Sequence, residues 1–466
     1  MRHMNLKPLF DPHAGKPVRV GLIGAGQFGA SLISQGGAIP NFRVAAVCDV
    51  KPERGVEAFA ASGVPRDAIR VCDTRAVAAG AIEAGRWVVV PDGGLLASLP
   101  LDIVVEATGD PEVGAANAVA AIDAGKHLVM VTKEADSVIG PLLARRAAAA
   151  GRIATPVDGD QPSLTIGLKS WAELLGLRVV AAGKASEYDF VWDPRAATVT
   201  SAHGRVAVPG FESMWAIHDR DPARVLAERG ALLAALPQRT VPDYTELCVI
   251  ANHTGLVPDR PDLHAAVARS LEVPDIFSPR AVGGVLARAG ALDVFNCLRR
   301  PDELSFAGGV FVVVECSHGP TWEVLREKGI PTSRSGRHAL LWNPQHLLGL
   351  EAPLSILAAC RLGVSCGAPQ PRPVCDLVAR ACRSFSPGER LAIHGNRHAI
   401  EGLDPLLVDA APVRAGNPVP YYMLPGARLK AAVPAGAMLC AEHVEAPAAS
   451  VLWKLRTEQD AAFFAR

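Results

Sequence analysis

Two consecutive apolar segments are each followed by ionisable residues of types that act on carbonyl compounds. HLVMVT (127–132) leads into Lys133, and GRIATPV (151–157) leads into Asp158 and Asp160. A lysine ammonium stabilises negative charge that develops on an oxygen, so Lys133 is a catalytic candidate. Carboxylates are hard oxygen ligands, so Asp158 and Asp160 are candidate ligands of Mg²⁺ or Mn²⁺.

Two carboxylates do not complete a metal site. A third ligand would have to come from Glu187, Asp189 or Glu246. In the alternative interpretation, the two aspartates orient a lysine or cap the following helix and hold no metal.

A glycine-rich turn near the N-terminus predicts a dinucleotide site. VRVGLIGAGQFGASLISQ (18–35) has the pattern of a strand, a GxGxxG turn and the start of a helix. Gly24 allows the tight turn, Gly26 lets the backbone approach a pyrophosphate, and Gly29 lets the helix pack closely on the strand. The helix N-terminus then offers N–H groups to the phosphates. The predicted cofactor residues of this turn are Gly24, Gly26, Gln27, Phe28 and Gly29.

Asp49 lies near the end of the next predicted strand, RVAAVCDV (43–50), 20 residues after Gly29. An acid at this distance hydrogen-bonds the ribose of NAD in dinucleotide-binding folds and disfavours the 2′-phosphate of NADP. Lys51 and Arg54 follow closely and would suit NADP. The predicted cofactor is therefore NADP or NAD, with the choice open.

A parallel sheet is needed to bring these groups together. Buried strands are predicted at RWVVVPD (86–92) and LDIVVEATGD (101–110), and a helix at PEVGAANAVAAIDAGK (111–126). In a doubly wound sheet, ligands bind outside the carboxyl ends of the strands. Thr108 and Gly109 are therefore predicted to contact the cofactor. The residues expected to face this crevice are Thr108, Gly109, Lys133, Glu134, Asp158 and Asp160.

Further polar residues cluster after residue 165. They lie in RVVAAGKASEYDFVWD (178–193), TELCVIANHTGLVPD (245–259) and GIPTSRSGRHALLWNPQHLLGLE (329–351). Arginine side chains and loop amides bind phosphates or carboxylates, while lysine and acids serve proton transfer. Each group also has a structural interpretation, as a solvated turn, a helix cap or a core histidine. The catalytic candidates are Lys184, Glu187, Asp189 and Glu246. The substrate candidates are Asp160, Gln161, Asn252, His253, Ser333, Arg334 and Arg337.

Composition limits the classes of function. The chain has 466 residues, 49% of them hydrophobic and 20% charged, which suits a globular protein of two or three domains. The formal net charge is zero, which gives no support for a nucleic-acid partner. No apolar run approaches the ~20 residues that span a bilayer, and the N-terminus lacks a signal-like apolar segment. The ten cysteines are scattered without a CxxC. These features predict a cytoplasmic enzyme with a small-molecule substrate and no membrane or nucleic-acid partner.

Several motifs together resemble one family over nearly the whole chain. They are GLIGAGQFG, DIVVEATGDPEVGA, KEADSVIGPLL, DGDQPS, ANHTGL, QHLLGLEAPLSI and LWKLRTEQD. The chain resembles the homoserine-dehydrogenase-like oxidoreductases with a C-terminal SAF domain, which include the deoxyxylulose phosphate reductoisomerase-like enzymes. The Gly-Thr-Asn motif of true homoserine dehydrogenases is absent, whereas TKEADS and VDGDQ are similar to reductoisomerase segments. The resemblance places Lys133 near the substrate carbonyl and Asp158 and Asp160 towards a metal.

The resemblance and the patterns together predict an α/β protein of three domains. These are an N-terminal Rossmann domain with a doubly wound parallel sheet (1–162), an α+β catalytic and dimerisation domain (163–367) and a small β-rich SAF-like domain with a closing helix (368–466). A homodimer or homotetramer is implied. The most specific function implied is NADPH-dependent rearrangement and reduction in isoprenoid precursor synthesis. The alternatives are a dehydrogenase of another sugar acid, polyol or homoserine-like substrate, and a non-catalytic dinucleotide sensor.

Overall fold

The structure is a computed structural model that describes residues 5–10, 16–394 and 398–465. The chain divides into two compact units, which we describe separately. The central unit comprises Leu164–His346 and Pro405–Asp409, and the terminal unit comprises Arg2–Ser163, Leu347–Asp404 and Ala410–Arg466. The predicted division into three domains stays a prediction. No helix of the described residues is long and apolar enough to cross a membrane.

The terminal unit contains a seven-stranded sheet in the order β3-β4-β2-β1-β5-β6-β7, and every neighbouring pair is parallel. Most of its strands are apolar and buried nearly throughout, as expected of a parallel sheet covered by helices on both faces. The predicted doubly wound parallel sheet is thus confirmed. Its strands are β1 (Val18–Ile23), β2 (Phe42–Cys48), β3 (Ile69–Val71), β4 (Trp87–Val90), β5 (Ile103–Glu106), β6 (His127–Met130) and β7 (Ala154–Pro156).

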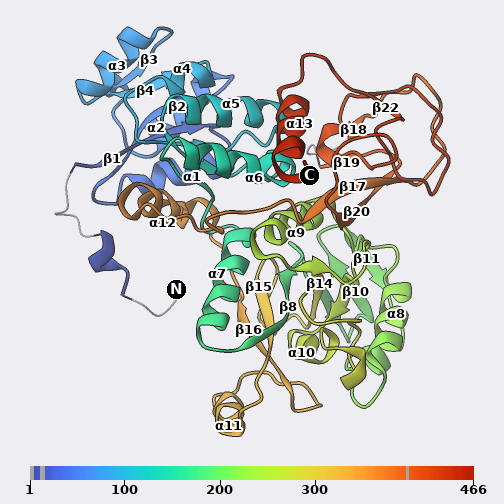
Figure 1. Cartoon of the computed structure of the whole chain (residues 1–466). Coiled ribbons are helices and arrows are strands. Elements are labelled where there is room, and N and C mark those ends of the chain that lie inside the picture. The colour runs from blue at the N-terminus through green and yellow to red at the C-terminus, as the bar shows by residue number, and fades with distance from the viewer. Residues whose placement is uncertain (1–4, 11–15, 395–397, 466) are drawn as a thin grey trace. The chain divides into compact units, whose positions relative to one another are not determined.

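Helices follow the strands of this sheet in alternation (Figure 1). Asp110 caps the predicted helix after β5 by accepting hydrogen bonds from two backbone N–H groups, with Pro111 as the first helical residue. The helices of the terminal unit are α1 (Gln27–Gly36), α2 (Pro52–Ala61), α3 (Arg75–Glu83), α4 (Gly93–Ala97), α5 (Pro111–Asp123), α6 (Lys133–Ala149), α12 (Ala352–Leu357) and α13 (Val451–Phe464).

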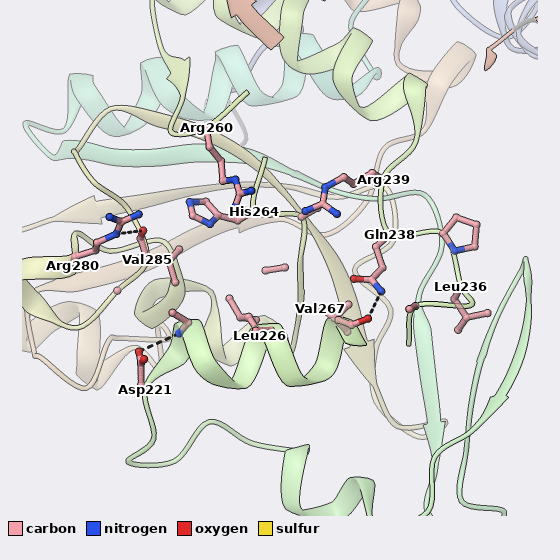
Figure 2. A pocket seen from close by; sticks show the side chains of 18 of the residues that line it. Asp221, Leu226, Leu236, Gln238, Arg239, Arg260, His264, Val267, Arg280 and Val285 are labelled. Atoms are coloured by element: carbon pink, nitrogen blue, oxygen red, sulfur yellow. Dashed lines mark hydrogen bonds between the residues drawn. The ribbon is translucent and has the colours of Figure 1, made fainter. Parts of the chain in front are cut away.

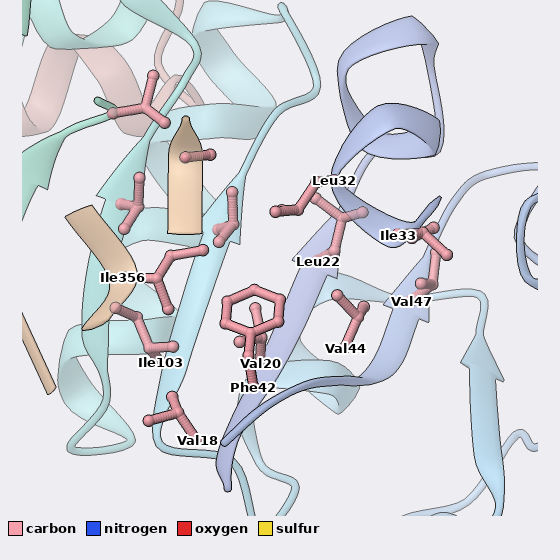
Figure 3. Close-up of a cluster of buried hydrophobic side chains, with 14 of the residues drawn as sticks. Val18, Val20, Leu22, Leu32, Ile33, Phe42, Val44, Val47, Ile103 and Ile356 are labelled. Carbon is pink, nitrogen blue, oxygen red and sulfur yellow. The ribbon is translucent and has the colours of Figure 1, made fainter. Parts of the chain in front are cut away.

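A core of aliphatic side chains lies between this sheet and the helices on one of its faces (Figure 3). Val20 and Leu22 of β1 and Ile103 of β5 meet Leu32 of α1 and Ile356 of α12. Each of these five side chains is almost completely buried. The core therefore anchors β1 and α1, the two elements that flank the glycine turn.

The closing helix α13 packs against α6 at a proline. Pro141 lies inside α6, and the amide side chain of Gln459 enters the helix there. It accepts a hydrogen bond from the Leu142 N–H at 3.1 Å and donates one to the Val138 carbonyl at 2.8 Å. The predicted closing helix is confirmed, and an inserted side chain of this kind satisfies backbone groups at a helix irregularity.

The C-terminal part of the chain contains short strands. Within the terminal unit, β18 pairs with β19 and β21 pairs with β22, both antiparallel. The small β-rich region of the prediction is therefore present. The strands of this part are β17 (Cys375–Ala381), β18 (Ile393–His394), β19 (Ala399–Ile400), β20 (Leu403–Asp409), β21 (Arg428–Leu429) and β22 (Val444–Glu445).

The central unit has a mixed sheet in the order β11-β10-β9-β14-β8-β15-β16, with β12 and β13 also paired to β14. Its core is formed by aromatic and aliphatic residues such as Phe277, Phe295 and Phe311. Its strands are β8 (Arg178–Ala185), β9 (Phe190–Asp193), β10 (Thr198–Ser201), β11 (Gly204–Ala207), β12 (Val257–Pro258), β13 (Ala266–Ala268), β14 (Ala291–Arg299), β15 (Val310–Glu315) and β16 (His338–Asn343). Its helices are α7 (Gln161–Leu174), α8 (Pro222–Leu232), α9 (Val241–Thr254), α10 (Val273–Ile276) and α11 (Gly319–Glu327), and α7 begins in the terminal unit.

Candidate active site

Two close contacts shape the glycine turn between β1 and α1. Gly24 has a φ of 102°, and a Cβ there would lie 2.4 Å from the carbonyl oxygen of Ala107. A Cβ at Gly29 would lie 2.2 Å from the carbonyl oxygen of Gly24. At Gly26, a Cβ would meet no atom of the described residues within 4 Å. The turn therefore needs glycine at two positions for its own packing, while the third leaves open space at the N-terminus of α1, where Gln27 begins the helix.

Asp49 follows β2 and holds this turn in place. Its carboxylate accepts hydrogen bonds from the Ala25 N–H at 2.9 Å and from the Lys51 N–H at 2.9 Å. The side chain thus connects the end of β2 to the turn, a role that the sequence analysis missed. Each carboxylate oxygen has a second lone pair, so Asp49 retains the capacity to accept a ribose hydroxyl, and that role stays a prediction.

A buried carboxyl group lies beneath the predicted cofactor residues at the end of β5. Glu106 is completely buried, and burial raises its pKa although hydrogen bonds oppose the rise. The hydroxyl of Thr108 donates to Glu106 Oε1 at 2.6 Å, and the Gly109 N–H donates to Thr132 Oγ1 at 3.0 Å. Glu106 and Thr132 therefore position the loop of Thr108 and Gly109. An acid as the last residue of an apolar strand is the signal that would have identified Glu106.

Lys133 and Asp160 form an ion pair next to the carboxyl ends of β6 and β7, which are neighbouring strands. Lys133 Nζ lies 2.9 Å from Asp160 Oδ2 and 3.2 Å from Oδ1. Asp160 is buried, and its Oδ1 also accepts the backbone N–H of Gln161 at 2.8 Å. The Lys133 side chain is 24% exposed, so part of it remains accessible. Both residues meet as predicted, with Lys133 as the first residue of α6.

The neighbouring acids are in less polar surroundings. Burial raises the pKa of Glu134 to about 7, and its carboxylate lies 3.6 Å from His398 Nδ1. Burial, with a contribution from the charge of Glu351, raises the pKa of Asp158 to about 6. The Asp158 N–H donates to Ser355 Oγ at 3.1 Å. These groups titrate close to neutral pH, where proton transfer is most effective.

The predicted metal site has two candidate ligands in the terminal unit. Asp160 is paired with Lys133, which agrees with the alternative interpretation that the acids orient a lysine. Within the described residues there is no group of three or more histidine, cysteine, aspartate or glutamate side chains that could hold a metal ion. The metal role of Asp158 and Asp160 stays a prediction, and we derive no chemical step through a metal.

Lys184 and Glu246, two predicted catalytic residues, form a buried network in the central unit. Lys184 Nζ lies 2.8 Å from Asp243 Oδ1 and is also paired with Glu246. Asp243 accepts further hydrogen bonds from Ser186 Oγ at 3.0 Å and Thr240 Oγ1 at 2.7 Å. Burial lowers the pKa of Lys184, but the charges of Asp243 and Glu246 outweigh this and the pKa is raised. Asp243 was missed by the sequence analysis, although its carboxylate and that of Glu246 keep the completely buried Lys184 charged.

The other catalytic candidates of the central unit have separate partners. Asp189 forms an ion pair with Arg299, at 2.5 Å between Oδ2 and Nε. The Glu187 carboxylate is 43% exposed and lies 3.8 Å from His346 Nε2. The charge of Glu187 contributes to the raised pKa of Lys184, whereas Asp189 is paired with Arg299. The catalytic role of both residues stays a prediction.

Asn252 and His253 lie in the last turn of α9. Asn252 is buried, and its amide nitrogen lies 3.9 Å from Cys248 Sγ. Burial lowers the pKa of His253 to about 4, so this imidazole is neutral at pH 7. A neutral, half-buried imidazole is compatible with the core-histidine interpretation. Their predicted contact with a substrate stays untested.

The loop with Ser333, Arg334 and Arg337 precedes β16. The Arg334 N–H donates to Asp275 Oδ1 at 2.8 Å, and its guanidinium lies 3.4 Å from the same oxygen. Ser333 Oγ accepts the His338 N–H at 3.1 Å. Arg337 is exposed. The loop is thus held by contacts of its own, and its predicted substrate role stays a prediction.

Comparison with known families finds a catalytic domain in the chain. Residues 240–352 match the family model described as "Oxidoreductase DRL, catalytic domain". The match confirms the prediction of an oxidoreductase at the level of enzyme class. It lies outside residues 368–466, so the SAF-like identity of that segment stays a prediction, as does the resemblance to homoserine dehydrogenases. No sequence among the curated proteins matches the chain.

Several solved structures of oxidoreductases align with part of the chain. A probable dehydrogenase from Thermotoga maritima has 17% sequence identity and a TM-score of 0.27, over 39% of this chain and 48% of that one. An oxidoreductase from Agrobacterium radiobacter, in complex with NAD⁺, L-tartaric acid and magnesium, has 14% identity and a TM-score of 0.27, over 37% and 46%. DOX-P reductoisomerase, in complex with NADPH, fosmidomycin and magnesium, has 18% identity and a TM-score of 0.27, over 36% and 45%.

The aligned region spans about half of the length of these solved structures. At such identities and TM-scores the likenesses are too weak to assign a substrate. A nicotinamide cofactor is supported by the site itself, through the parallel strand order, the glycine turn and the carboxylate of Asp49.

Proposed function

We propose that the chain is an NAD(P)-dependent oxidoreductase that interconverts a hydroxyl and a carbonyl group of a small polar compound. The observation that carries this proposal is the ion pair of Lys133 and Asp160, next to the carboxyl ends of two strands in a sheet with a dinucleotide-type glycine turn. This edge of a doubly wound sheet is where ligands bind. The matched oxidoreductase catalytic domain supports the same class of reaction.

The residues of the terminal unit fit a dinucleotide. The open backbone at Gly26 lets a pyrophosphate approach the N-terminus of α1, and Asp49 lies at the end of the strand next to β1. When bound, the nicotinamide ring would donate or accept a hydride. Thr108 and Gly109 lie between the glycine turn and Lys133 in the order of strands, so they would line the path between the two.

The Lys133 ammonium would stabilise the alkoxide that forms when a carbonyl carbon accepts a hydride. Asp160 keeps the ammonium in position and keeps it charged, because an opposite charge at 2.9 Å favours the protonated form. After transfer of the hydride, Lys133 would donate a proton to the alkoxide oxygen and be reprotonated from solvent through its exposed face. Such fixed electrostatic stabilisation is commonly the largest single contribution to a rate enhancement.

The more specific form of the proposal is a reaction similar to that of deoxyxylulose phosphate reductoisomerase, with rearrangement before reduction. The family model that matches residues 240–352 and the likeness of TKEADS and VDGDQ to reductoisomerase segments support it. Asp158 and Asp160 would then supply ligands to Mg²⁺ or Mn²⁺, with further ligands from the substrate. A homodimer or homotetramer belongs to the same proposal.

The test is oxidation of NADPH and of NADH, followed by absorbance, with deoxyxylulose phosphate and with or without Mg²⁺ or Mn²⁺. Metal-dependent turnover is the expected result. Turnover only with other sugar acids or polyols, without rearrangement of the carbon skeleton, would exclude the reductoisomerase-like reaction. The proposal of an NAD(P)-dependent oxidoreductase would then stand without it. Tight cofactor binding with no turnover on a broad panel of substrates would overturn the enzyme proposal in favour of a dinucleotide sensor.

A further inference from the structure

A large cavity in the central unit has a cationic side and an apolar side. Its volume is about 950 Å³, and drug-sized ligands occupy cavities of roughly 300–1,000 Å³. Figure 2 shows Arg239, Arg260 and Arg280 along one side, with His264 among them. Leu226 of α8 lies on the opposite side.

The cationic side has more positive than negative charge. Within the described part of the chain, no carboxylate lies within salt-bridge distance of Arg239 or Arg280. The Arg239 guanidinium instead donates to the carbonyl oxygen of Asp262 at 2.8 Å, and Arg280 Nε donates to that of Val285 at 3.1 Å. Carbonyl oxygens hold a guanidinium without neutralising it, so both side chains keep N–H groups for an anion. The Asp262 carboxylate also interacts electrostatically with Arg239, which leaves Arg280 as the arginine with the less opposed charge. Arg260 is paired with the Asp262 carboxylate.

The loop that carries Arg260 and His264 is strained and firmly held. Leu263 and Ala265 have positive φ angles of 56° and 48° although neither is glycine. Such conformations are unfavourable for residues other than glycine and persist only where the surroundings enforce them. The buried Asp293 does so, since its carboxylate accepts the N–H groups of His264 and Ala265 at 3.0 to 3.1 Å.

Other buried groups hold the same backbone through its carbonyl oxygens. The hydroxyl of Tyr244 donates to the Asp262 carbonyl at 2.8 Å, and the Asn296 amide donates to the Ala265 carbonyl at 3.1 Å. On the Arg280 side, a Cβ at Gly284 would lie 1.9 Å from the Ser278 carbonyl oxygen, so that loop is closed tightly as well. Arg260 and Arg280 therefore project from two backbone segments whose conformations are set before any ligand binds. Arg239 lies on a third segment, where the Asn296 amide donates to the Gln238 carbonyl at 3.0 Å.

We propose that this cavity binds an organic phosphate that carries an apolar group. The guanidinium groups of Arg239 and Arg280 would take the phosphate, since arginine binds phosphate oxygens through paired N–H donors. Leu226 and Val267 would contact the apolar group. The lining also includes Asp221, whose carboxylate caps α8 by accepting the Ala223 N–H at 3.2 Å.

The residues that line this cavity are not the ones assigned to the reaction. Its lining includes neither Lys184, Asp243 nor Glu246, and all of it belongs to the central unit, whereas Lys133 and Asp160 belong to the terminal unit. A ligand there would be a second small molecule that the chain recognises, in addition to the cofactor and substrate of the proposed reaction.

The test is titration calorimetry of the full chain with phenyl phosphate, inorganic phosphate and benzoate. The double variant combines Arg239→Ala and Arg280→Ala. The control is Arg326→Ala, because Arg326 is an exposed arginine of the same unit outside the cavity. We expect phenyl phosphate to bind more tightly than the other two probes. Its Kd should rise at least about tenfold in the double variant and less than about twofold in the control, since a phosphate–guanidinium contact is a charge-assisted bond.

Equal affinity of phenyl phosphate for wild type and double variant would overturn the proposal, as would tighter binding of benzoate. Arg280→Lys, which keeps the charge and loses the paired donors, is the second variant if the double variant does not fold. It should raise the Kd by an intermediate factor. The KM of Arg280→Ala for deoxyxylulose phosphate tests whether the cavity binds the phosphate of the substrate or that of a second ligand. If this KM rises by the same factor as the Kd of phenyl phosphate, the cavity is the substrate site and the proposal of a second ligand is overturned.

Discussion

Lys133 and Asp160 come from the ends of neighbouring strands and form an ion pair with 2.9 Å between Nζ and Oδ2. The aspartate is buried while the lysine side chain remains 24% exposed. This asymmetry gives the two residues different roles, because the buried partner fixes the geometry and the exposed partner is the one that a substrate can reach.

Lys133→Ala should therefore lower kcat/KM by about 10²–10³-fold, the usual effect of removing one group that stabilises an oxyanion. Asp160→Asn should have a smaller effect, because the ammonium group is still present and loses its charged partner and its fixed orientation. Lys328→Ala is the matched control, since this lysine is exposed at the end of α11. Steady-state kinetics with NADPH measures all three. Turnover of Lys133→Ala equal to that of the control would show that Lys133 does not act in the reaction.

Two glycine variants should separate cofactor binding from folding. Gly26→Ala should leave Tm unchanged, because its Cβ meets no described atom within 4 Å, and should raise the Kd of NAD(P)H at least about tenfold by blocking the pyrophosphate. Gly29→Ala should lower Tm, because its Cβ would lie 2.2 Å from the Gly24 carbonyl oxygen. Calorimetric melting and fluorescence titration measure the two effects. Unchanged cofactor affinity in a folded Gly26→Ala would contradict a pyrophosphate at this turn.

Lys184→Met should destabilise the fold by about 3–5 kcal/mol, because it leaves the carboxylates of Asp243 and Glu246 buried without their cation. Neutralising all three residues, with Asp243→Asn and Glu246→Gln added, should recover much of this loss. Urea unfolding measures the free energy of each variant. A variant at Lys184 that loses turnover at unchanged stability would instead favour the predicted catalytic role.

Asp136 should make stability depend on pH. Burial raises the pKa of its carboxyl from 3.8 to about 7, so the folded chain binds more protons than the unfolded chain between these values. The free energy of unfolding contributed by this group is therefore largest below pH 3.8 and falls as the pH rises to about 7. Asp136→Asn should reduce this slope by up to ~1.4 kcal/mol per pH unit, measured by urea unfolding between pH 4.5 and 7.5. The exposed Asp123→Asn is the control, and an identical slope in both variants would contradict the assignment.

The sequence by itself determined the parallel sheet and the place of the cofactor turn. Continuous apolar strands separated by helical segments can bury both faces only in a doubly wound sheet, and the spacing of Gly24, Gly26 and Gly29 is local information. The same holds for the helix Pro111–Asp123, whose first residue and cap are adjacent in the chain. The meeting of Lys133 and Asp160 was predictable because neighbouring parallel strands end at one edge.

Only the tertiary structure decided which charged groups are buried and which partners they have. The partner of Lys184 is Asp243, 59 residues away along the chain, and no local pattern distinguishes this aspartate from a solvated one. Arg239, Arg260 and Arg280 line one cavity although they come from three separate segments of the chain, and Asp293 and Asn296 of β14 hold the backbone after Arg260. Burial and the pairing of distant side chains depend on the packing of whole elements, and they set the charge state and accessibility of each group.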